Sequence, residues 1–80
     1  MTTIIGIKID DRKSSAQKVQ EILTDYGCII RSRLGLHAMK NQQCTQYGII
    51  LLEVTDDEQA ISLESALGEI ENVQLQKMLF

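Results

Sequence analysis

The sequence predicts an α+β fold in which four strands and two helices follow one another in the order β-α-β-β-α-β. Two stretches carry apolar residues three or four positions apart, each with a helix-capping pattern at its start. The four stretches that flank them are rich in β-forming residues, most of them with alternating or continuous apolar positions. Because the chain has 80 residues, we expect a single domain spanning residues 1–80.

The first half of the chain predicts a strand at Thr3–Ile9, a turn at Asp10–Lys13 and a helix. Ser14 with Gln17 three residues later forms a capping-box pattern, which marks the helix start. A glycine, Gly27, follows the last periodic residue, where a left-handed C-cap is expected. The apolar stripe of the helix comprises Ala16, Val19, Ile22, Leu23 and Tyr26.

The middle of the chain predicts a hairpin of strands Cys28–Lys40 and Tyr47–Val54 around a polar loop at Asn41–Gln46. A glycine inside a strand often marks a bulge, so we expect one at Gly35. Tyr47–Val54 is apolar on both of its alternating faces, and such a strand requires cover on both sides. The chain has enough helix for one side only, so the sequence predicts an uncovered apolar sheet face.

The second half predicts a helix that begins with a capping box of Thr55 and Glu58, ends at Glu71–Asn72 and precedes a last strand at Val73–Phe80. This element order is the ferredoxin-like arrangement, a four-stranded antiparallel sheet with two helices on one face. Its first and third strands are central, and the second lies at an edge beside the third. The stripe of the second helix comprises Ala60, Leu63, Leu67 and Ile70.

Composition limits the classes of partner. The net charge is −3 without a run of like charges, and the chain has one Phe and no Trp, which argues against direct nucleic-acid binding. The apolar runs are far too short to span a bilayer. No signal peptide is apparent, so we expect a cytoplasmic protein in which Cys28 and Cys44 are reduced.

Two groups of residues are candidates for binding a ligand. Asp10, Asp11 and Arg12, in the first strand-to-helix loop, could frame a ligand at a helix N-terminus. Arg31 and Arg33 are predicted on one side of a strand, beside Gly35, where they could clamp a carboxylate or phosphate. The plainer interpretation, a solvated turn and a charged edge strand that deters aggregation, is favoured for both groups.

The one histidine, His37, lies seven residues before Cys44, a spacing that a hairpin could close around a metal ion. Two ligands do not make a metal site, so a surface or interface histidine is the favoured interpretation. No phosphate-binding glycine loop, CxxC, HExxH or nucleophile elbow occurs. We therefore expect neither a cofactor nor an enzymatic activity.

Nearly the whole chain resembles one known family. The segments IIGIKIDDR, SAQKVQEILTDYG, IIRSRLGL and GIILLEVTDDEQAISLESALGEIENVQLQ are similar, in order and spacing, to the iron-only hydrogenase system regulator family. Asp11-Arg12, Tyr26-Gly27 and Arg33-Leu34-Gly35 fall where that family carries similar residues. The resemblance implies a ferredoxin-like fold of the ACT-like type, related to the regulatory domain of the nickel-responsive repressor, and oligomer formation.

Two departures narrow what the resemblance implies. Amino-acid-binding ACT domains carry a glycine in the first strand-to-helix loop, where this chain has Asp10 to Lys13. The nickel repressor has two alternating histidines on the second strand, and here the corresponding positions hold Gly35 and His37, with Cys44 near its cysteine. A nickel site of that type is therefore incomplete, and proline commonly occupies the position of His37 in the family.

Together these observations predict a non-enzymatic, homo-oligomeric regulatory or effector-sensing domain without a DNA-binding module of its own. It would serve as a transcriptional regulator or as an accessory protein of hydrogenase maturation. A homodimer or homotetramer is expected through the sheet face, the Cys28–Lys40 edge strand or both, with a small-molecule effector at the subunit interface. The alternative is a module that responds to nickel or iron through His37 and Cys44.

Overall fold

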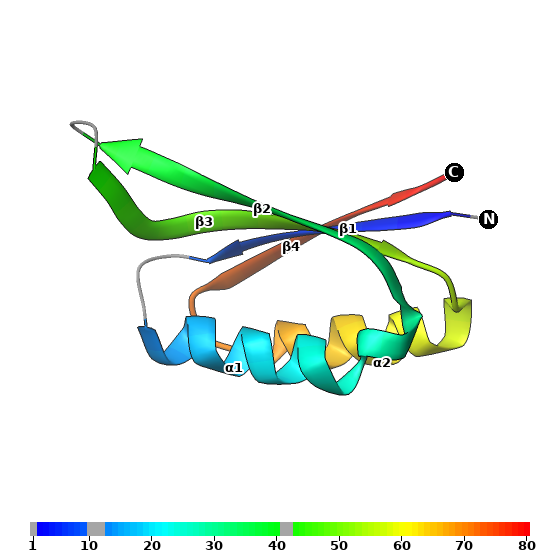
Figure 1. Ribbon diagram of the computed structural model, residues 1–80. Helices are drawn as coiled ribbons and strands as arrows, with labels where there is room; N and C mark the ends of the chain where they lie inside the picture. The colour runs from blue at the N-terminus through cyan, green and yellow to red at the C-terminus, as the bar shows by residue number, and fades with distance from the viewer. Residues whose placement is uncertain (1, 10–12, 41–42) are drawn as a thin grey trace.

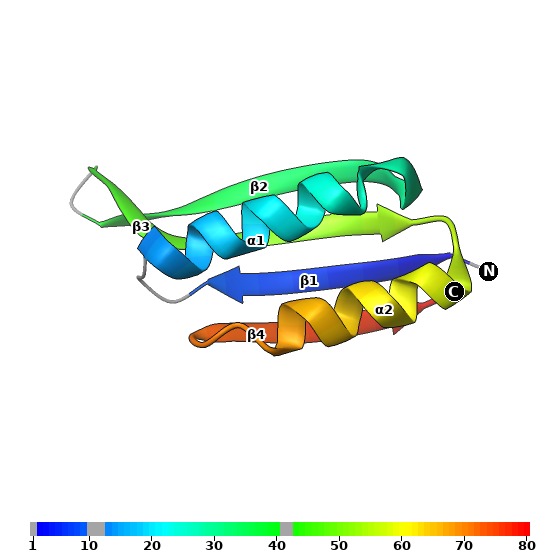
Figure 2. The same cartoon turned by 90° about the horizontal axis from the view of Figure 1, so that it is seen from below.

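The computed structural model describes residues 2–9, 13–40 and 43–80, and the side chains of residues 2–9, 15–36 and 48–80. Four strands form one antiparallel sheet in the order β2-β3-β1-β4, and both helices cover the same face of it (Figures 1 and 2). The predicted element order and the ferredoxin-like arrangement are confirmed. The elements are β1 (Thr3–Ile9), α1 (Lys13–Asp25), the short 3₁₀ helix η1 (Gly27–Ile29), β2 (Ile30–Lys40), β3 (Gln43–Val54), α2 (Asp57–Gly68) and β4 (Val73–Leu79).

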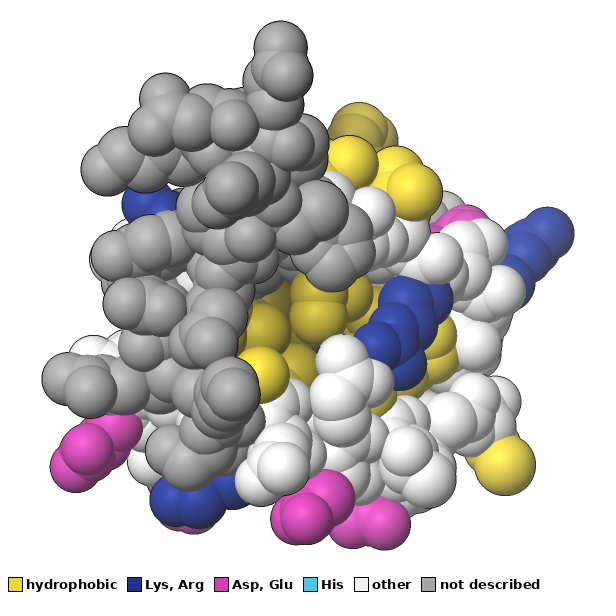
Figure 3. All heavy atoms as spheres, turned by 60° about the vertical axis from the view of Figure 1, so that its left-hand side comes forward, with side chains coloured by type: hydrophobic (Ala, Val, Ile, Leu, Met, Phe, Trp, Pro, Cys, Tyr) yellow, Lys and Arg dark blue, Asp and Glu magenta, His cyan; other side chains and the backbone are white. Residues whose placement is uncertain are grey.

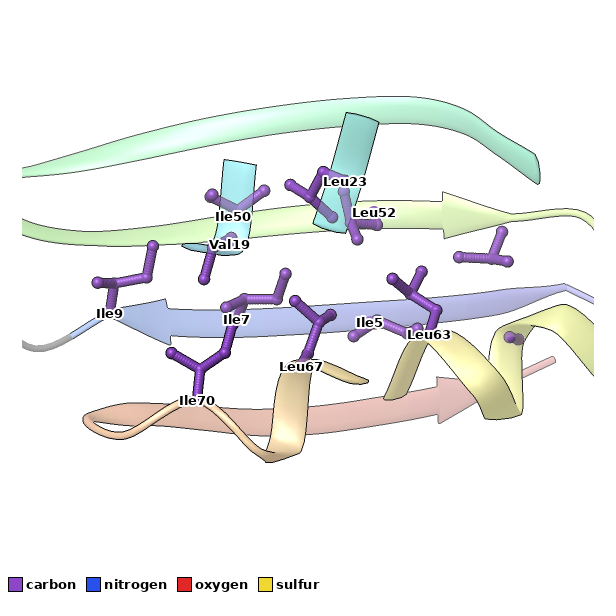
Figure 4. Close-up of a cluster of buried hydrophobic side chains, with 12 residues drawn as sticks. Ile5, Ile7, Ile9, Val19, Leu23, Ile50, Leu52, Leu63, Leu67 and Ile70 are labelled. Carbon is purple, nitrogen blue, oxygen red and sulfur yellow. The ribbon is translucent and has the colours of Figure 1, made fainter. Parts of the chain in front are cut away.

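The hydrophobic core lies between the helices and the two central strands, β1 and β3 (Figure 4). In the register of these strands Ile5 pairs with Leu52 and Ile7 with Ile50, so all four side chains point toward the helices. Each fully buried aliphatic side chain of this kind contributes about 1.5–3 kcal/mol through removal from water. The helices contribute Val19, Leu23, Ala60, Leu63 and Leu67, and Ile70 follows α2.

Both predicted capping boxes are wrong in detail. α2 is capped by Asp56, whose Oδ1 accepts a hydrogen bond of 2.8 Å from the Gln59 backbone N–H. Thr55 instead uses its N–H and its hydroxyl to bind the carbonyl of Ile29. α1 begins at Lys13, so Ser14 lies in the first turn and not at the cap. The next residue, Ser15, is buried, and its hydroxyl donates to the Glu71 carbonyl at 2.8 Å.

The helix ends also differ from expectation. Gly27 has no left-handed backbone, because the chain continues from α1 through a turn into η1. α2 ends at Gly68, three residues before the predicted end, and Asn72 has a positive φ of 65° directly before β4. A short polar side chain tolerates this left-handed conformation better than most others do, so Asn72 suits the turn.

The hairpin is longer than the sequence predicted. β2 begins at Ile30, two residues after Cys28, and β3 begins at Gln43, inside the stretch predicted as loop. Gly35 pairs regularly with Ile50, so the predicted bulge at Gly35 is wrong. The register shifts instead between Ile30 and Ser32 and between His37 and Met39.

Truncation of a core side chain should cost most of the stability of a chain this short. Leu63 on α2 has no exposed surface, and Leu63→Ala is expected to lower the free energy of unfolding by about 2–5 kcal/mol because it leaves a cavity. Ile61 on the same helix is 64% exposed, so Ile61→Ala should change it by less than about 0.5 kcal/mol. Urea unfolding at one fixed protein concentration measures both, and equal losses would contradict this description of the core.

The observed cap of α2 can be tested separately. Asp56→Ala removes the acceptor for the Gln59 N–H and should lower the free energy of unfolding by about 0.5–2 kcal/mol. Asp56→Asn keeps an oxygen at the same position and should leave stability close to that of the wild type. An equal loss in both variants would show that the carboxylate acts through its charge and not as a cap.

Candidate functional site

The sheet face that carries no helix, here called the open face, is the main candidate site. Among the residues whose side chains the structure describes, the cross-strand register places twelve on this face, three from each strand. Several of its large apolar side chains are exposed, with Leu34 56%, Leu36 47%, Ile49 40% and Met78 51% accessible. The double apolar character predicted for Tyr47–Val54 is confirmed for the described residues, because Ile50, Leu52 and Val54 are buried under the helices whereas Ile49 and Leu51 lie on the open face. The other members are Ile4, Gly6, Lys8, Ser32, Glu53, Gln74 and Gln76.

A hollow of about 270 Å³ lies on the open face over Gly6, the residue of β1 that has no side chain. Its walls come from the three neighbouring strands β3, β1 and β4. The surface view shows hydrophobic side chains in a hollow with a basic side chain beside it (Figure 3). The residues that line the hollow over Gly6 are Gly6, Ile7, Lys8, Ile49, Leu51, Gln74 and Gln76.

Among the described residues that line this hollow, Lys8 is the one with a charge. Its side chain is exposed, and it forms no hydrogen bond or ion pair with any residue in the described part of the chain. Lys77, by contrast, donates to Glu64 of α2 at 3.1 Å on the helix-covered side. The hollow therefore combines apolar walls with an ammonium group that has no described anionic partner.

The structure separates the two arginines that were predicted to lie on one side of β2. The register between β2 and β3 shifts between Ile30 and Ser32. Arg31, at this shift, has its Nε 4.0 Å from Glu53 Oε1 of β3. Ser32 Oγ donates to the same carboxylate oxygen at 3.1 Å. Arg33 points the other way, and its guanidinium donates to the Gln20 side chain on α1. A two-arginine clamp for an anion is therefore not formed.

The remaining candidates are only partly within the described residues. Asp10, Asp11 and Arg12 lie outside them, so the predicted ligand site in that loop stays a prediction. For His37 and Cys44 the backbone alone is described. Cys44 pairs with Met39 and His37 with Gly48, which sets the two residues four positions apart along β3, about 13 Å at the usual rise of a strand. Directly paired residues, by comparison, have Cβ atoms about 5 Å apart. His37 and Cys44 are therefore not a directly paired couple across the hairpin.

Other features of the described residues add no catalytic arrangement. No cluster of three or more His, Cys, Asp or Glu side chains with metal-binding geometry occurs among them. Within the same residues, no helix is long and apolar enough to cross a membrane. A second, smaller hollow of about 130 Å³ lies between α2 and β4, where Ile61 and Leu79 are exposed.

The comparison with known proteins agrees with the fold and indicates a family. A model of the TM1266-like family, described as "Iron-only hydrogenase system regulator, putative", matches residues 1–77. The chain belongs to the TM1266-like family. The resemblance drawn from the sequence is thereby confirmed, and the description of the family supports a regulatory role. No functionally curated protein matches the chain.

Solved structures show the same fold. The uncharacterized protein TM1266 from Thermotoga maritima superimposes with a TM-score of 0.83 at 26% identity, over 96% of this chain and 92% of that one. The de novo designed protein Foldit4 has a TM-score of 0.70 at 14% identity, over 100% of this chain and 99% of that one. The second likeness concerns the fold alone, because the identity is low.

Gly35 can be tested as a candidate site residue. A Cβ at Gly35 would meet no atom within 4 Å, whereas a Cβ at Gly48 would lie 3.2 Å from the Leu36 carbonyl oxygen. Gly35→Ala should therefore raise the free energy of unfolding by about 0.5–1 kcal/mol, since glycine in a strand is entropically costly. Gly48→Ala should gain less or lose stability. Thermal unfolding of both variants tests this prediction. A loss of stability in Gly35→Ala would show that the fold requires the glycine backbone or the empty space beside it.

Proposed function

We propose that this member of the TM1266-like family is a regulatory module that acts as a homo-oligomer, with two copies meeting across the open face. The observation that carries the proposal is the exposure of Leu34, Leu36, Ile49 and Met78 together on one side of the sheet. Soluble monomers rarely expose a continuous apolar patch of more than a few hundred Å². The description of the family as a regulator supports the functional half of the proposal.

A second copy of the chain is the occupant that best matches this face in size. The Cα trace extends 40 Å by 22 Å along its two longest directions, so a full sheet face offers roughly the 800 Å² per partner that a standard stable interface buries. A homodimer of this kind needs no further chain, because the same patch serves both partners in an isologous interface. The apolar centre of the face matches the composition of such interfaces.

The length of the hairpin supports the same conclusion. β1 ends opposite Gly48, so among the described strands β2 alone pairs with residues 43–47 of β3. This end of the hairpin is a two-stranded extension of the sheet, which Figure 1 shows projecting beyond β1 and β4. Two strands alone are marginally stable in water, so contact with a second copy would stabilise the extension.

The regulatory action would then depend on assembly. A net charge of −3 is a poor match for the phosphate backbone of nucleic acid. A module of this kind would instead act on a protein partner or respond to an effector by changing its oligomeric state. The quantity that changes with regulation would be the fraction of chains that are assembled.

Sedimentation velocity at micromolar concentration tests the assembly. The wild type is expected to sediment as a dimer or larger, and Leu34→Glu, which places a charge in the apolar face, should shift it to the monomer. Ile61→Glu is the matched control, since Ile61 is also exposed but lies on α2, away from the open face.

Circular dichroism of the three proteins should be the same, because both substituted residues are exposed. A monomeric wild type would refute the proposal. Dissociation by Ile61→Glu with Leu34→Glu still assembled would move the interface to the side of α2 and β4 and would equally refute it.

A further inference from the structure

We infer that the hollow over Gly6 binds a small organic anion, a carboxylate with a short apolar body, enclosed between two copies of the chain. The inference rests on the self-association proposed above, because the hollow is open toward the second copy. It assigns a ligand class and a binding residue, Lys8, to a part of the open face that the sequence did not single out.

The glycine at position 6 has no explanation within the chain itself. A Cβ there would meet Leu51 Cδ2 at 3.6 Å and the Gln76 carbonyl oxygen at 3.9 Å, both ordinary van der Waals distances. An alanine would therefore fit, and it would avoid the cost of about 0.5–1 kcal/mol that glycine carries inside a strand. The missing side chain matters only if something from outside the chain occupies the space, which amounts to about 270 Å³.

The lining of the hollow specifies the chemistry of the occupant. Ile49 and Leu51 provide an apolar wall from β3, and the exposed Lys8 provides a positive charge. Ligand pockets usually measure about 300–1,000 Å³, with mostly apolar walls and a few polar groups that fix orientation. The hollow, at about 270 Å³, lies just below this range, which suits a small molecule with one anionic group and a short aliphatic or aromatic body.

Self-association makes the anion necessary. A second copy on the open face would take Lys8 out of water, and a buried ammonium group is costly without a partner of opposite charge. No carboxylate among the described residues lines the hollow, and the acidic residue that they place on the open face, Glu53, is already in contact with Ser32 and Arg31. A bound carboxylate would neutralise Lys8, while its apolar body would fill the space over Gly6.

Hexanoate and benzoate are suitable probes, with 1-hexanol and hexylamine as neutral and cationic counterparts of hexanoate. Binding is followed through the methyl NMR signals of Ile49 and Leu51 in the full chain. We expect the two carboxylates to shift these signals at millimolar concentration and hexanoate to bind at least about tenfold more tightly than 1-hexanol, as a charge-assisted contact allows. Because the ligand is enclosed on assembly, hexanoate should also favour the assembled form in sedimentation.

Three variants locate the site. Gly6→Leu fills the hollow and should abolish the hexanoate shifts, and Lys8→Met should weaken hexanoate binding about tenfold without changing 1-hexanol binding. Lys77→Met is the matched control, because it removes the same charge from the helix-covered side, where Lys77 is paired with Glu64. It should bind hexanoate as the wild type does.

The outcomes separate this inference from the proposed assembly. An assembled chain whose Ile49 and Leu51 signals respond to neither carboxylate overturns the ligand site and leaves the assembly standing. Equal binding of hexanoate and 1-hexanol, or unchanged binding in Gly6→Leu, also overturns the site. A monomeric chain that still shows the hexanoate shifts supports the site on the open face and overturns both the assembly and the enclosure between copies.

Discussion

The rest of the structure depends on one constraint, the apolar character of β3 on both of its faces at the centre of the sheet. The β-α-β connections place both helices on one face (Figure 2), as right-handed crossovers require. Ile50 and Leu52 are consequently buried, whereas Ile49 and Leu51 remain on the open face. The covered face provides the stability of the fold, and the other provides the surface on which a function can be based.

The sequence predicted the elements well where a local pattern determines their bounds and caps, and poorly where contact with a distant residue determines them. Thr3–Ile9 has the bounds predicted from its alternation, since a period of two is visible within the strand itself. The cap of α2 was assigned to Thr55, but the N–H and hydroxyl of Thr55 both contact the Ile29 carbonyl, 26 residues away. Asp56 is left to cap the helix, and no short-range pattern distinguishes these adjacent residues.

The candidate site was likewise predicted poorly where contacts between distant parts of the chain determine it. Alternation put Arg31 and Arg33 on one side, yet the register shift between Ile30 and Ser32 separates them, and such a shift depends on the pairing with β3. The hollow over Gly6, with Lys8 at its side, was not predicted from the sequence. Its walls come from Ile49, Leu51 and β4, which are brought beside β1 by long-range pairing.

Gly6 and Gly48, the glycines of the two central strands β1 and β3, differ in the reason for having no side chain. At Gly48 the reason lies inside the chain, because an added Cβ would press against the Leu36 carbonyl at 3.2 Å. At Gly6 the neighbours leave room for a methyl group, so the internal packing accepts a residue that would be more stable there than glycine. A residue that lowers the stability of a central strand without a structural reason is best explained by what approaches from outside. On this argument the open face is shaped for contact at Gly6, and the charge of Lys8 beside it determines what kind of molecule can complete that contact.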